Sequence, residues 1–190
     1  MQFHLETSIE INIDDSDARE KGYLLSGKIL HVEFDESGFE SRRTEMGRIS
    51  AYRILGEADA LFAWADNANQ DLQFAVEWLC RQEGDLEEMA LTSGCLYLNN
   101  VWVEPAWRGR GLALKAVAAF LELFARNGFV FLRPYPYEAS EDPNERERQI
   151  EKLWLHWQQL GLNHYDPKEN ILWESEWYCP EPLLGTEAVL

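Results

Sequence analysis

The chain has few residues of the kinds that build disulfide frameworks and metal sites. Its three cysteines, Cys80, Cys95 and Cys179, are odd in number and widely spaced, and they form no CxxC pair. Its four histidines form no HExxH pattern. Paired cysteines and closely spaced histidines are what such frameworks and sites require. We therefore expect no disulfide framework, no bound metal, and a reducing, cytoplasmic location.

Long apolar runs and positive charge are also scarce. No apolar run approaches the ~20 residues that span a bilayer, and the first residues, MQFHLETSIEINIDD, lack the pattern of a secretory signal. Only 17 Lys and Arg stand against 34 Asp and Glu, a net charge of −17. The negative electrostatic field of such a chain repels nucleic acid and anionic membranes, and it attracts amines or basic proteins. The short basic stretch of Arg42, Arg43 and Arg48 does not outweigh it, so we expect neither nucleic acid nor membrane as a partner.

What the chain does contain predicts a folded core. Hydrophobic residues make up 46% of the 190 residues and aromatic residues 13%, which differs from the composition of disordered proteins. No shift in composition and no long Pro, Gly or Ser stretch divides the chain. We expect one domain over residues 1–190, as a monomer or a homodimer.

The first half alternates apolar and polar residues, which is the pattern of half-buried strands. Three strands are expected, marked by Ile9, Ile11 and Ile13, by Leu30, Val32 and Phe34, and by the run GRISAYRIL at residues 47–55. A helix should follow, because Leu72, Ala75, Val76, Leu79 and Cys80 recur at helical spacing behind possible caps at Asn67 and Asn69. The first half therefore predicts an antiparallel meander followed by a helix.

The second half alternates strands and helices. The predicted elements are a strand ending at Pro105, a helix from Leu112 to a cap at Gly128, a fifth strand over 129–138 broken by two prolines, a helix capped by Asp142 and ended by Gly161, and a last strand over 171–180. The helix from Leu112 carries an apolar stripe of Ala113, Ala116, Val117, Phe120 and Phe124. Strands and helices together indicate an α+β fold.

The joint between the fourth strand and its helix, VEPAWRGRGLALKAV at residues 103–117, predicts an anion site. Glycines let a backbone turn tightly, and the unpaired N–H groups of a helix's first turn attract negative charge. The amides of residues 109–113 would converge on a diphosphate, with Arg108 and Arg110 adding charge. The two glycines, Gly109 and Gly111, matter more here than the two arginines.

This joint resembles a known motif. The pattern V-x-P-x-x-R-G-x-G-x-A, met as Val103, Pro105, Arg108, Gly109, Gly111 and Ala113, resembles the acetyl-CoA-binding motif of the GNAT superfamily of N-acetyltransferases. The resemblance covers about residues 95–178. It implies a single-domain, mixed, mostly antiparallel splayed sheet flanked by helices, with acetyl-CoA inserted between the fourth and fifth strands. The implied contacts are Val101, Trp102 and Val103 with the pantetheine arm, and Arg108, Gly109, Arg110, Gly111, Leu112, Ala113 and Leu114 around the diphosphate.

The resemblance also implies a reaction, N-acetyl transfer to the amine of a cationic small molecule or basic protein. The tyrosine that many members use as an acid aligns with Trp157, which cannot donate an acidic proton, so Tyr165 is the candidate substitute. Glu138 and Glu33 are the candidate bases. Tyr97, Tyr135 and Tyr137 are the candidate acceptor-pocket residues, with Arg133 beside them. Each of these side chains also fits an ordinary solvated or packed role, and a non-catalytic CoA-binding or regulatory domain is the alternative function.

Overall fold

The computed structural model describes residues 4–10, 22–55, 61–62, 64–66, 70–82 and 94–183, and its described strands form one mixed sheet. In spatial order the strands are β1 (His4–Glu10), β2 (Gly22–Phe34), β3 (Glu40–Ile54), β4 (Cys95–Val103), β5 (Phe129–Leu132), β7 (Ile171–Glu174) and β6 (His164–Asp166). All neighbouring strands pair antiparallel except β4 and β5, which pair parallel. The predicted α+β class with a mixed, mostly antiparallel sheet is confirmed.

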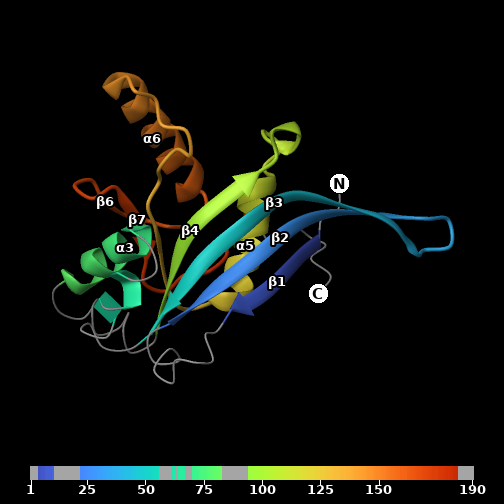
Figure 1. Ribbon diagram of the computed structural model, residues 1–190, viewed down its shortest axis with the longest axis horizontal. Helices are drawn as coiled ribbons and strands as arrows, with labels where there is room; N and C mark the ends of the chain where they lie inside the picture. Colours follow the sequence, from blue (N-terminus) through green and yellow to red (C-terminus); the bar gives the residue numbers. More distant parts are fainter. Residues whose placement is uncertain are drawn as a thin grey trace.

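Helices cover both faces of this sheet (Figure 1). The helices whose bounds are described are α3 (Gln70–Cys80), α5 (Leu112–Phe124) and α6 (Pro143–Gln158), with the single turns η1 (Pro105–Trp107) and η2 (Glu181–Leu183). The core under α5 includes Leu96 and Leu98 of β4, and the core under α3 includes Cys95 and Tyr97. Because side chains alternate along a strand, β4 is buried on both faces. We call the two sides of the sheet the α5 face and the α3 face.

The hairpin of β2 and β3 extends beyond the other strands as a two-stranded arm (Figure 1). β1 pairs with β2 as far as Leu30, and β4 pairs with β3 as far as Gly47. The prediction that Phe34 faces the core with Leu30 and Val32 is wrong, because Phe34 is 53% exposed. It lies near the tip of the arm, where none of the described helices covers the strands, and a register shift falls between Glu33 and Phe34.

Two strands near the C-terminus differ from the prediction. β5 ends at Leu132, shortly before Pro134, which has no N–H to continue a ladder. β7 ends at Glu174, so the predicted strand over 171–180 is too long. Beyond it the chain turns inward and buries Trp177, whose Nε1 donates to the Leu160 carbonyl at 2.7 Å. The three-residue β6 was not predicted.

The helix ends agree with the sequence in part. Asp142 caps α6 by accepting a hydrogen bond from the Asn144 backbone N–H, as predicted. The predicted cap at Gly128 is wrong: the chain leaves α5 at Ala125, and Asn127 takes the left-handed conformation with φ of 60°. Asparagine tolerates that conformation better than most side-chain-bearing residues, so the glycine is not needed there. The caps predicted at Asn67 and Asn69, and the strand residues Ile11 and Ile13, lie outside the described residues.

Candidate active site

The parallel strands β4 and β5 diverge after four pairs of residues. Their register runs from Cys95 opposite Phe129 to Leu98 opposite Leu132. Beyond that last pair, which we call the divergence point, β4 continues to Val103 alongside β3 only. Over residues 99–103, the edge of β4 that faces away from β3 therefore has no strand partner among the described residues. An extended amide-bearing ligand could pair with this backbone edge as a neighbouring strand would.

A β-bulge in β4 coincides with the divergence point. Ser50 of β3 is opposite Asn100 while the next residue, Ala51, is opposite Leu98, so Asn99 is the extra residue. The bulge shifts the alternation: even-numbered Leu96 and Leu98 face α5 before it, and odd-numbered residues face α5 after it. The Asn99 side chain donates weakly from Nδ2 to Ser50 Oγ at 3.4 Å, and its Oδ1 is buried without a hydrogen-bond partner.

The loop from Glu104 to Gly111, which we call the glycine loop, leads from β4 into α5. Gly109 and Gly111 have φ of 74° and 70°, in the left-handed region that favours glycine. A Cβ added at either position would meet no atom within 4 Å, so the space beside both is open. Gly111 is the N-cap of α5 and provides no side-chain hydrogen bond to its first turn, which contains no acidic residue. The N–H groups of that turn are thus left to bind an anion.

The two arginines of the glycine loop have different roles. Arg108 donates from Nε to the Val103 carbonyl at 2.8 Å and so ties the loop to the end of β4. Arg110 places its guanidinium 5.1 Å from the Trp107 ring centroid, in a cation–π contact. Trp107 in turn contacts the ring of His31 on β2 at 5.4 Å. Both arginines are exposed, so their charge is available to a ligand as well as to the loop.

The structure brings the predicted cofactor residues together. Val101 and Val103 face α5, while Trp102 between them is partly buried. Leu112 and Leu114 point into the core, each 7% exposed, so only their backbone is open to a ligand. The predicted set therefore forms one continuous surface of β4 edge, glycine loop and helix N-terminus. A cradle of open glycines beside unpaired amides fits the pantetheine amides and the diphosphate of CoA.

The predicted acceptor residues lie in different surroundings. Tyr97 is 3% exposed and contacts the Phe131 ring at 5.0 Å within the core under α3. Burial raises the pKa of the Tyr97 phenol well above its usual value. Tyr135 is exposed, and its ring centroid lies 5.7 Å from the Arg133 guanidinium carbon. Tyr137 is 82% exposed. The structure thus places Tyr97 and Arg133 at the divergence point and leaves Tyr137 in solvent.

The predicted acid and bases lie apart from one another. Glu33 lies in the exposed hairpin arm, opposite Arg42. Glu138 is exposed in the segment between β5 and α6. Tyr165 lies on the edge strand β6, where its hydroxyl donates to Asn170 Oδ1 at 3.2 Å and burial raises the pKa of the phenol. The structure does not gather these three, and each stays a prediction.

Asn99 was not among the residues predicted from the sequence. The signal was present in the run CLYLNNVWV, where two adjacent asparagines interrupt an apolar strand and the alternation changes phase. Such a phase change inside a strand is the mark of a bulge, and bulges often re-aim residues beside functional sites. Phe74 of α3, whose ring centroid lies 4.1 Å from the Arg133 guanidinium, was not among the predicted site residues, and the sequence carried no signal for this contact.

Comparison with known proteins supports the same assignment as the geometry. A family model described as acetyltransferase (GNAT) family matches residues 30–149, more than half of the chain. No curated protein and no solved structure matches. In the described part of the chain, no helix is long and apolar enough to cross a membrane, and no three His, Cys, Asp or Glu side chains gather as a metal site would require. The matched segment includes the β4 edge, the glycine loop and α5, and the chain belongs to the GNAT family of acetyl-CoA-dependent acetyltransferases.

Proposed function

We propose that this acetyltransferase moves the acetyl group of acetyl-CoA to an amine by direct attack within a ternary complex. The unpaired edge of β4 running into the open glycine loop is the observation that carries the proposal. Acetyl-CoA supplies an acyl group activated as a thioester. The amine nitrogen forms the new C–N bond, the C–S bond breaks, one proton goes from nitrogen to a base, and CoA leaves as a thiolate that later takes up a proton.

The chain's own groups hold and polarise the reactants. The free backbone edge of β4 over residues 99–103 pairs with the amides of the pantetheine arm. The amides from Gly109 to Ala113 bind the diphosphate, with Arg110 adding positive charge. A β4 backbone N–H near the bulge at Asn99 stabilises negative charge that develops on the carbonyl oxygen. These donors belong to a strand of the sheet and a helix start, so they need little rearrangement when the ligand arrives.

Acetyl-CoA should stabilise the fold against heat. A ligand present at 100 times its Kd adds about 2.7 kcal/mol, and a chain of this size gains roughly 2–4 °C per kcal/mol. We therefore expect the midpoint of thermal unfolding to rise by about 5–10 °C with excess acetyl-CoA, as followed by differential scanning fluorimetry. AMP, which lacks the pantetheine arm, should shift it much less. No shift at saturating acetyl-CoA would remove the basis of the proposal.

The acidic surface supports a cationic amine as acceptor. A net charge of −17 raises the local concentration of amines around the whole molecule. The competing function, a non-catalytic CoA-binding or regulatory domain, is favoured by Trp157 at the position of the family's tyrosine and by the separation of Glu33, Glu138 and Tyr165. Release of free CoA thiol in the presence of an amine panel separates the two, because a regulatory domain would bind acetyl-CoA and release none.

Glu138 is the carboxylate that follows β5 most closely along the chain, and we propose it as the base. Glu138→Gln should lower kcat/KM by about 10²-fold, the lower end of the effect of general-base catalysis. The thermal shift with acetyl-CoA should remain unchanged. The control is Glu141→Gln, which neutralises another exposed glutamate of the same segment and should keep full activity. Equal activity in the two variants would assign proton removal to a different group.

A further inference from the structure

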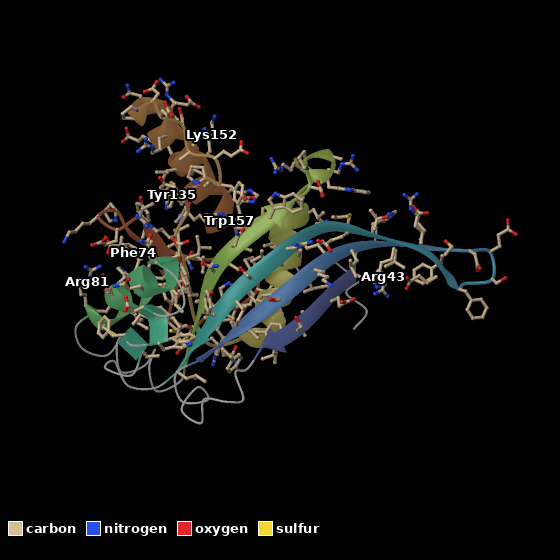
Figure 2. The ribbon with its side chains drawn as sticks, viewed as in Figure 1. Arg43, Phe74, Arg81, Tyr135, Lys152 and Trp157 are labelled. Carbon is tan, nitrogen blue, oxygen red and sulfur yellow. The ribbon has the colours of Figure 1, made fainter. Side chains whose placement is uncertain are left out.

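Arg133 is a partly buried arginine with no anionic partner among the residues that the structure describes. Its Nε is buried and has no hydrogen-bond partner. Its guanidinium instead lies against two aromatic rings, 4.1 Å from the centroid of Phe74 and 5.7 Å from that of Tyr135 (Figure 2 labels both rings). Buried polar groups are nearly always satisfied, and leaving one unsatisfied destabilises the fold. Because the unsatisfied Nε of Arg133 does not stabilise the fold, we take it as an indication that Arg133 binds a ligand.

The position of Arg133 connects it with the reaction. It directly follows Leu132, the last β5 residue paired with β4. Phe129 and Phe131 belong to the core under α3, so the alternation of the strand puts residue 133 on the α3 face, where it meets Phe74 of α3. The glycine loop leads into α5, on the opposite face. Arg133 therefore borders the divergence point on the α3 face. The proposed diphosphate site is on the α5 face, so the α3 face is free for a second substrate.

Asn99 supplies a second unsatisfied atom at the same place. It follows Leu98, the β4 partner of Leu132, and its Oδ1 is buried with no hydrogen-bond partner. Its Nδ2 bonds to Ser50, a residue between Ile49 and Ala51 of the α5-face core, which places the amide on the α3 face. One orphaned donor and one orphaned acceptor thus lie on the same face, one residue beyond the divergence point on each strand.

We propose that the acceptor is an amine that also carries a carboxylate, with the carboxylate bound by Arg133 and the amine donating to Asn99 Oδ1. This inference rests on the proposed acetyl transfer and narrows its acceptor. A guanidinium offers a planar fork of donors that matches a carboxylate. The flanking rings of Phe74 and Tyr135 reduce solvation there, which strengthens such a pair. A polyamine fits poorly, because its second positive charge would meet Arg133.

The charges around Arg133 leave room for such a ligand. Asp71 of α3 acts electrostatically on the buried Tyr97, as does Arg133 with the opposite sign. Asp71 nevertheless forms no ion pair with Arg133, and no other described carboxylate does so. In a chain of net charge −17, an unpaired arginine at this point gives local preference for an anion.

Matched pairs of acceptors test the proposal. Each standard amino acid is compared with its primary amide, which keeps the amine and side chain and removes only the carboxylate, with CoA thiol release as the readout. The best free acid should exceed its amide in kcat/KM by about 10²-fold, the range of a hydrogen-bonded charge pair. Arg133→Met, which keeps an apolar stem on Phe74, should remove that preference by raising KM for the acid. Arg133→Lys should restore part of it.

Controls separate this inference from the proposed function. Arg126→Met removes an exposed arginine beyond the far end of α5 and should leave the preference unchanged. Asn99→Leu should lower kcat/KM for the acid and the amide alike, because it removes the Oδ1 atom that accepts from the amine of both acceptors. Amides or diamines accepted as well as acids, an Arg133→Met variant with an unchanged preference, or no activity with either series would overturn the carboxylate site. The acetyl-CoA thermal shift would survive all of these outcomes, whereas its absence would count against the proposed function itself.

Discussion

We expect Gly111→Val to abolish the thermal shift produced by acetyl-CoA and Gly38→Val to keep it. Both glycines have left-handed backbone, with φ of 70° and 79°. At both positions an added Cβ meets no atom within 4 Å. Both variants should therefore lose similar stability, about 1–3 kcal/mol, for holding a β-branched residue at positive φ. Only Gly111 borders the start of α5, so only its new side chain would enter the space that we propose for the diphosphate.

The expected loss of affinity at Gly111 is large. Hydrogen bonds to charged groups contribute about 1.5–3 kcal/mol each, so the loss of two of them weakens binding by roughly 10³-fold. Isothermal titration of acetyl-CoA into each variant measures this directly, and circular dichroism shows whether both variants remain folded. Binding by Gly111→Val that equals binding by Gly38→Val would mean that the glycine loop does not hold the diphosphate.

The sequence predicted the parts of the fold that depend on short-range periodicity. The long strands, the apolar stripe of α5 and the cap of α6 at Asp142 all follow from patterns within about ten residues. The errors have a different origin. Phe34 alternates correctly but lies in an arm that no second layer covers, and this depends on where the neighbouring strands end. β6 has only three residues, and it is a strand because β7 lies beside it.

The candidate site divides in the same way. The proposed cofactor cradle is one continuous stretch of chain, from β4 through the glycine loop to α5, so a local motif is enough to propose it from the sequence. The acceptor side is assembled from β4, β5 and α3, which meet only in the folded protein. In the sequence, Arg133 stands out only because prolines and tyrosines follow it in the run RPYPY. Its contact with Phe74 and its unsatisfied Nε could be found only in the structure.

The described site contains no tyrosine at the position of the family's acid. Trp157 stands where the family's tyrosine is expected, and Tyr165 is bonded to Asn170 on the edge strand β6. A thiolate leaving group needs less help from an acid than an alkoxide does, because a thiol has a pKa near 8.5. The absence of a tyrosine at residue 157 is therefore compatible with catalysis. The prediction of one domain over residues 1–190 also stays a prediction.

Replacing Trp177 has the largest expected effect on stability. Trp177 is fully buried, and its Nε1 donates to the Leu160 carbonyl at 2.7 Å. Its backbone exchanges hydrogen bonds with Asn127 and Gly128, so it joins the segment after β7 to the end of α5. Trp177→Ala should lower the free energy of unfolding by about 3–5 kcal/mol, and the midpoint of thermal unfolding by roughly 10 °C or more.

Two further variants separate the causes of that loss. Trp177→Phe keeps most of the ring but leaves the Leu160 carbonyl without its donor, so it should lose only about 1–3 kcal/mol. Tyr178→Ala removes the neighbouring exposed ring and should change stability by no more than about 0.5 kcal/mol. Denaturant unfolding at equilibrium measures all three. Because α5 is about 20 Å long and Trp177 lies at its far end from the glycine loop, Trp177→Phe should keep the full acetyl-CoA shift. A loss of that shift in Trp177→Phe would mean that the packing at the end of α5 controls the cradle at its start.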